Sequence, residues 1–74
     1  AHLREAFRVL KNGGRLVVVE WRPEADENLP GPAQGSRLAP ETVENWMREA
    51  GFIVRETREV GPFHYGVFAV KTER

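Results

Sequence analysis

The side chains of this sequence that could do chemistry gather beside two apolar segments. Glu20, Trp21 and Arg22 follow the segment LVVV, and His64 and Tyr65 open the segment HYGVFAV. A histidine can serve as a general base near neutral pH or donate a hydrogen bond, which makes His64 the candidate catalytic residue. The alternative is a structural histidine whose hydrogen bonds are satisfied inside the fold.

The other side chains of this group also have ordinary alternatives. Tyr65 is expected to be a packed aromatic residue rather than a proton donor. Glu20 could bind a substrate, but it could equally accept a hydrogen bond from a loop N–H group or pair with Arg22. Trp21 and Trp46 are expected to anchor a core or an interface.

Composition argues against several classes of function. The 74 residues include no cysteine, no His, Asp and Glu set has metal-ligand spacing, and Ser36 is the only serine, with no base near it in sequence. We therefore expect neither a metal centre nor nucleophilic catalysis. Eleven basic side chains balance eleven acidic ones, so nucleic acid and anionic membranes are not expected partners. No apolar run is long enough to span a bilayer, and we expect a soluble, cytoplasmic domain.

The first half of the chain predicts a helix, a buried strand and a long loop. Residues 2–11 repeat apolar side chains at the spacing of one helical face, and the Asn-Gly-Gly sequence after them ends that helix. Residues 16–19 are apolar without interruption, which is typical of a strand covered on both faces. Residues 22–38 form a loop of a length that often carries function.

The second half predicts another helix and two more strands. The helix begins at Pro40 and ends at Gly51. Residues 52–60 suit an edge strand whose charged run, 55–59, is a solvated face, whereas residues 64–70 are apolar on both faces and should lie inside the sheet. The short turn between them makes these strands antiparallel, and the helical crossover makes the first two strands parallel. We predict one α/β domain over residues 1–74, in the order α-β-α-β-β, with a mixed three-stranded sheet ordered first, third, second.

This topology brings the polar residues together at one end of the sheet. In an open α/β sheet, ligands bind beyond the carboxyl ends of the parallel strands. The end of the first strand and the turn after the second strand meet there. The expected substrate-side rim consists of Glu20, Trp21, Arg22, Phe63, His64 and Tyr65.

Three segments carry a family resemblance. LREAFRVLKNGGRLVVVE is similar to a pattern L-x-x-x-x-R-V-L-K-P-G-G-x-L-x-x-x-E, and RLAPETVENWMREAGF to L-S-x-E-E-x-x-x-x-L-x-x-A-G-F. VGPFHYGVFAVK resembles a closing hairpin. Together the chain resembles the C-terminal half of the class I S-adenosylmethionine-dependent methyltransferases over nearly its whole length, apart from the loop at 22–38. Asn12 replaces a usual proline, and Ala39 replaces a serine that would cap the second helix.

The resemblance implies a partial Rossmann-like fold, with S-adenosylmethionine as the cofactor of the family. The family binds this cofactor with a glycine-rich loop after its first strand and an acidic residue after its second, and this sequence has no G-x-G-x-x-G. Gly13 and Gly14 lead into a strand rather than out of one, and Gly31 and Gly35 have no strand before them. We therefore expect no cofactor-binding residue here, no cofactor binding by the chain alone and no catalysis by it alone.

Two hypotheses remain open for such a half-fold. The chain is either the substrate-side fragment of a methyltransferase whose N-terminal half is supplied elsewhere, or a non-catalytic half-domain that associates with itself. The first strand would be a sheet edge in the isolated chain, and an exposed apolar edge tends to pair with another chain. We expect a homodimer joined edge to edge through residues 15–20.

Overall fold

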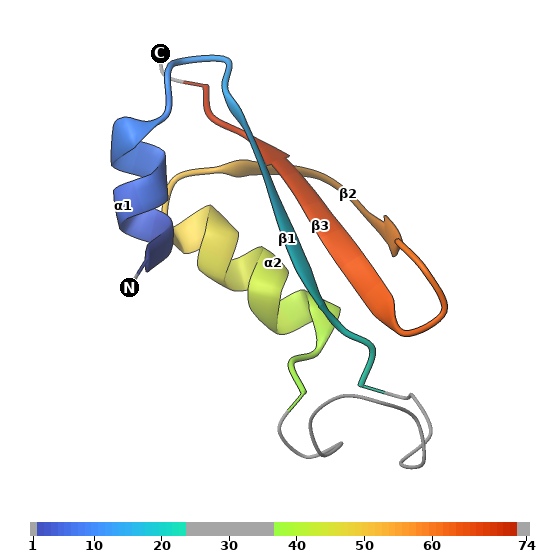
Figure 1. The fold of residues 1–74 in the computed structure, drawn as a ribbon. Coiled ribbons are helices and arrows are strands. Elements are labelled where there is room, and N and C mark those ends of the chain that lie inside the picture. The colour runs from blue at the N-terminus through green and yellow to red at the C-terminus, as the bar shows by residue number, and fades with distance from the viewer. Residues whose placement is uncertain (1, 24–36, 73–74) are drawn as a thin grey trace.

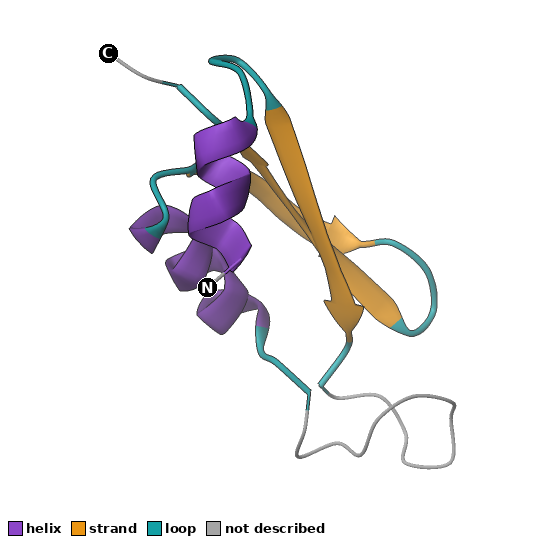
Figure 2. Cartoon of the chain, turned by 60° about the vertical axis from the view of Figure 1, so that its left-hand side comes forward, coloured by secondary structure: helices purple, strands orange, loops and turns teal. Residues whose placement is uncertain are grey.

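The computed structural model describes residues 2–23 and 37–72. Its elements follow in the order α1 (His2–Val9), β1 (Arg15–Trp21), α2 (Pro40–Glu49), β2 (Ile53–Glu59) and β3 (His64–Val70). Both helices lie on one face of the sheet, as Figure 1 and Figure 2 show. The predicted element order is confirmed, while residues 24–36 of the predicted loop lie outside the described residues. Neither of the two described helices is long and apolar enough to cross a membrane.

The sheet is organised around its last strand. Its order is β1-β3-β2, and β3 runs antiparallel to both neighbours. Val67 at its centre lies opposite Val18 of β1 and Thr57 of β2. The expected sheet order is confirmed, and β1 and β2 point in the same direction on either side of β3 (Figure 1).

Helix α2 begins and ends where its sequence predicts. Pro40 occupies the first turn, where its missing N–H group costs nothing, and Ala39 before it provides no side-chain capping bond. Gly51 then takes a φ of +110°, a conformation that side-chain-bearing residues rarely adopt. Between these ends, Val43 and Met47 are buried against the sheet.

The core fills the space between the helices and one face of the sheet. Phe7 of α1 meets Phe52 edge-on, with ring centroids 5.2 Å apart, which joins the two helical segments. The helix-facing side chains of β3 close the core from the sheet side. The buried apolar residues are Val43, Met47, Phe52, Tyr65, Val67 and Ala69.

The other face of the sheet is open, which corrects the expectation that β1 is covered on both faces. Leu16 and Val18 pack toward the helices, but Val17 is 45% exposed and Val19 52% exposed. Because side chains alternate along a strand, the apolar run is divided between a covered and an uncovered face. Neither described helix covers the second face (Figure 2). Trp46 is also 46% exposed, so it does not anchor the core.

A buried lysine fastens the end of β3 to the first helix. Lys71 is only 5% exposed, and its Nζ donates hydrogen bonds to the carbonyl oxygens of Phe7 at 2.5 Å and Leu10 at 2.9 Å. These carbonyls end α1, where a cation is favoured by the helix dipole. The backbone of Lys71 pairs with the turn as well, since its N–H group donates to Gly14 O at 2.8 Å.

An exposed ion pair also stabilises α1. Arg8 donates two hydrogen bonds to the carboxylate of Glu5, one turn earlier on the helix. This contact lowers the pKa of Glu5 and raises the pKa of Arg8. The ion pair therefore contributes to stability above the ordinary pKa of a glutamate. This contribution is lost as the pH falls through the lowered pKa of Glu5. Solvent screens the pair strongly, so the effect on stability is small.

We predict that replacing Lys71 by methionine lowers the free energy of unfolding by about 2 kcal/mol, because two helix-end carbonyls lose a charged donor. Urea denaturation followed by circular dichroism measures this loss. Lys11→Met is the matched control, since Lys11 is exposed and should change stability little. Equal stability of the Lys71→Met variant and the native chain would contradict the assignment.

A second prediction concerns Gly51. A Cβ atom there would lie 2.9 Å from Cζ of Phe7, in addition to the strain of a positive φ. Gly51→Ala should therefore lower the free energy of unfolding more than Gly61→Ala, by roughly 1 kcal/mol or more. Gly61→Ala is the control. Gly61 has a φ of +132°, but a Cβ atom at this position would meet no other atom within 4 Å, so this variant measures the cost of the backbone strain without a steric clash. Equal losses in the two variants would show that the contact with Phe7 is unimportant.

Candidate functional site

The expected rim residues meet at one end of the sheet. Trp21 lies opposite His64, and Glu20 lies opposite Tyr65, in the register of β1 and β3. The N–H group of Arg22 donates to Phe63 O at 2.8 Å and closes this end. The structure therefore brings the rim together at the carboxyl end of β1.

The rim is nevertheless divided between the two faces of the sheet. Trp21 and His64 lie on the open face, where their ring centroids are 4.1 Å apart with the planes tilted by 40°. Glu20 and Tyr65 lie on the face that the helices cover, because neighbouring residues of a strand point to opposite sides. A single small substrate on one face would contact one of these pairs and not the other.

Tyr65 has a structural role on the covered face, as expected. Its ring is buried, and its hydroxyl donates a hydrogen bond to Leu38 O at 2.7 Å. This bond holds the segment that enters α2 against the sheet. Tyr65 thus supports the cleft described below rather than offering a proton at the surface.

Arg22 pairs with Glu59 and not with Glu20. Its Nη1 lies 3.5 Å from Oε1 of Glu59 and donates to Pro62 O at 3.3 Å. Among the described residues no ion pair joins Glu20 and Arg22, so the alternative in which these two side chains pair is not supported. Arg37 adds to the rim, since its Nη1 donates to Arg22 O at 2.9 Å and its guanidinium lies 5.7 Å from the centre of the Trp21 ring.

His64 packs against an aromatic ring without an orienting carboxylate. Within the described ranges, no side chain forms a hydrogen bond with its imidazole, whereas a general base normally has a partner that fixes its orientation. The catalytic role of His64 stays a prediction. The same part of the chain contains no group of three His, Asp or Glu side chains arranged to hold a metal ion.

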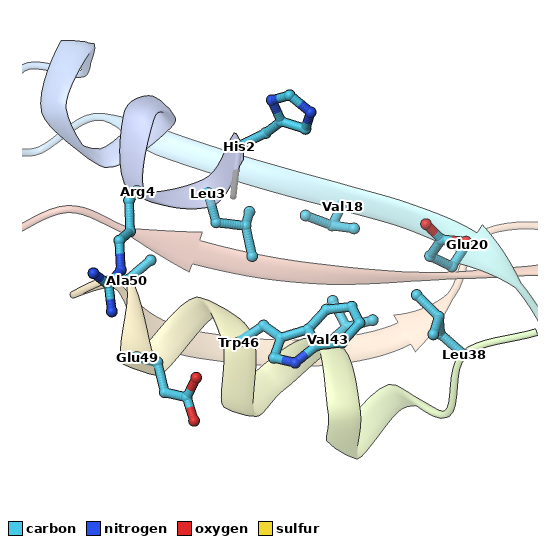
Figure 3. A pocket seen from close by; sticks show the side chains of 10 residues that line it. All are labelled: His2, Leu3, Arg4, Val18, Glu20, Leu38, Val43, Trp46, Glu49 and Ala50. Carbon is cyan, nitrogen blue, oxygen red and sulfur yellow. The ribbon is translucent and has the colours of Figure 1, made fainter.

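A cleft of about 500 Å³ opens on the helix-covered side, beside the rim. It lies between the first turn of α1, the outer part of β1 and one side of α2 (Figure 3). Sequence reasoning did not identify this cleft, although Glu20 follows Leu16 and Val18 at the two-residue period of the covered face. Its lining residues are His2, Leu3, Arg4, Val18, Glu20, Leu38, Val43, Trp46, Glu49 and Ala50.

The adjacent glycines do not suit a phosphate or cofactor loop. The N–H group of Gly13 donates to Lys71 O at 2.6 Å, and that of Gly14 donates to Lys11 O at 2.8 Å. Both amides are thus used by the fold itself, at the end of the sheet opposite the rim. Gly31 and Gly35 lie outside the described residues. The amides of Gly13 and Gly14 are therefore not available to a phosphate or a cofactor.

Comparison with known proteins gives one informative likeness. No family model and no curated protein matches the sequence. Among solved structures, the chain is similar to the crystal structure of "a putative type 11 methyltransferase from Sulfolobus solfataricus", with a TM-score of 0.75 and 23% sequence identity. The likeness covers 99% of this chain and 41% of that one.

The chain has a partial methyltransferase fold. At this identity the likeness concerns the fold alone, and it confirms the architecture that the three sequence segments indicated. The chain spans about two fifths of the length of the Sulfolobus protein.

We predict that Tyr65→Phe lowers the free energy of unfolding by about 1 kcal/mol, because Leu38 O loses its buried hydrogen-bond donor. Thermal or urea unfolding measures the change. Thr57→Val is the matched control on the helix-covered face of the sheet. It removes a hydroxyl that donates to the carboxylate of Glu44, and neither of these residues lines the cleft. Only Tyr65→Phe should shift the NMR signals of Leu38, and unchanged signals there would contradict the role assigned to Tyr65.

Proposed function

We propose that this chain is the substrate-side part of an S-adenosylmethionine-dependent methyltransferase and is inactive alone. The observation that supports the proposal most is the fold likeness, which extends over 99% of this chain and 41% of a protein described as a methyltransferase. The three sequence segments agree with it. The cytoplasmic location stays a prediction.

In this proposal the rim contributes to the binding of the methyl acceptor. Trp21 and His64 offer a stacked aromatic surface on the open face, and Glu20 offers a carboxylate on the other face. Arg22 and Phe63 fix the position of the turn between β2 and β3 through their backbone bond. S-adenosylmethionine, bound by another part of the protein, would supply the methyl group.

We predict that the 74-residue chain does not bind S-adenosylmethionine, because its paired glycine amides are occupied within the fold. Isothermal titration calorimetry on the folded chain, verified by circular dichroism, tests this. Micromolar binding would refute the inactivity of the isolated chain.

A chimera gives the proposal a positive test. In it, this chain replaces the matching segment of the Sulfolobus protein. We expect the chimera to fold and to bind S-adenosylmethionine with an affinity similar to that of the parent, whereas the parent lacking this segment should not. A chimera that folds without binding the cofactor would count against the methyltransferase assignment.

A second candidate function is self-association without catalysis. Among the described strands, β1 pairs with β3 only, so its other edge has no strand beside it. Val17 and Val19 are exposed next to that edge. A second copy pairing through residues 15–20 would extend the sheet and cover part of this apolar surface.

This candidate predicts a homodimer at micromolar concentrations in light scattering. The double variant Val17→Lys, Val19→Lys should be a monomer, because charged side chains beside an edge oppose strand pairing. Val9→Lys is the control, since Val9 is 63% exposed but lies on α1, away from the sheet edge. A monomeric native chain at tens of micromolar would reject self-association and leave the first candidate.

A further inference from the structure

The cleft beside α2 combines apolar walls with a polar group at one end. Leu3, Val18, Leu38 and Val43 are among its lining residues, and each contributes an aliphatic side chain. A volume of about 500 Å³ falls in the range of small-molecule pockets. Such a cleft can hold an apolar body of modest size and exclude water from around it.

Glu20 is the polar group at the rim end of this cleft. Its side chain is half-buried, and within residues 2–23 and 37–72 it forms no hydrogen bond or ion pair. Figure 3 shows its carboxylate on the side of the cleft where Leu38 lies. A half-buried carboxylate without a protein partner is energetically favourable only while water or a bound donor satisfies it.

The other charged residues of the lining lie away from Glu20. Arg4 and Glu49 appear together at the opposite end of the cleft, near Ala50, and the ring of His2 points away from α2 (Figure 3). One positive and one negative group balance each other at that end. Among the charged residues that line the cleft, Glu20 alone lies at the rim end, while the rim cations Arg22 and Arg37 are not part of the lining.

Trp46 adds an aromatic surface between the two ends. Its indole lines the cleft and is 46% exposed, which is unusual for so large an apolar side chain that has no contact role in the core. An indole face attracts cations as well as apolar groups. A carboxylate and an indole in one apolar cleft favour a ligand that is both cationic and hydrophobic.

We propose that this cleft binds a small molecule with a protonated amine and an apolar body. The ammonium group donates to the carboxylate of Glu20, and the apolar body lies along Val18, Leu38 and Trp46. An anionic ligand would meet the repulsion of Glu20, and a neutral one would leave this carboxylate without a strong donor. The inference concerns binding by this chain and does not depend on the methyl-transfer proposal.

The test uses hexylamine as the probe, with hexanol and hexanoate as neutral and anionic analogues of the same length. Two-dimensional NMR of the 74-residue chain follows each titration. We expect hexylamine to shift the indole N–H signal of Trp46 and the methyl signals of Val18 and Leu38 in a saturable way. Hexanol should bind at least about tenfold more weakly, and hexanoate should not bind.

Substitution of Glu20 and of Glu49 tests which carboxylate of the cleft binds the ammonium group. Glu20→Gln should lower the affinity for hexylamine at least about tenfold and leave the affinity for hexanol unchanged. Glu49→Gln should change the affinity for either probe by less than about twofold. The comparison of hexylamine with hexanol on the native chain keeps the test valid if Glu20→Gln does not fold.

Three outcomes would overturn the proposal. They are an absence of saturable hexylamine binding, equal affinity for hexylamine and hexanol, and shifts confined to residues outside the cleft.

Discussion

The pairing of β3 with both other strands is the constraint on which this structure depends. Within the described part of the chain, β1 and β2 form no ladder with each other, and each forms its ladder with β3. Because α2 connects β1 to β2, its placement over the sheet follows from the same two ladders. Lys71 extends this arrangement to α1, since it follows β3 directly and donates to the last carbonyls of that helix.

A core on one side of the sheet is the second feature that shapes the molecule. Both helices pack on the same face, which buries Val67 and Ala69 but leaves Val17 and Val19 exposed on the other. A chain of this size buries a smaller share of its surface than a larger domain does, even with a complete core, so a one-sided core gives modest stability. This asymmetry agrees with the partial methyltransferase fold, in which the chain corresponds to 41% of a larger structure.

The sequence predicted the elements well and the contacts between them poorly. Periodicity located both helices and the central strand, because apolar spacing reports directly on which side is buried. It could not show that the second face of β1 is open, since an uninterrupted apolar run looks the same whether its cover is present or absent. The bonds of Lys71 and Tyr65 were also missed, because each joins residues that lie far apart in the sequence.

In the candidate site, too, the sequence predicted the placement of the residues but missed the contacts between them. The rim was expected at one end of the sheet, and its residues do lie there, because strand order and strand direction determine where segments end. The assignment of Glu20 to the covered face and of His64 to the open one follows from register, which the turn length alone did not reveal. The cleft beside Trp46 depends on the distance between two helices, and no pattern along the chain reports that distance.

The position of β3 at the end of the element order has a consequence for biosynthesis. Strand β1 leaves the ribosome early, but its partner emerges only after the loop, α2 and β2 have been made. At ordinary translation rates this delay lasts on the order of a few seconds. During that interval the valines of β1 lack β3 as their pairing partner, and a nascent-chain chaperone that recognises short apolar segments could bind them.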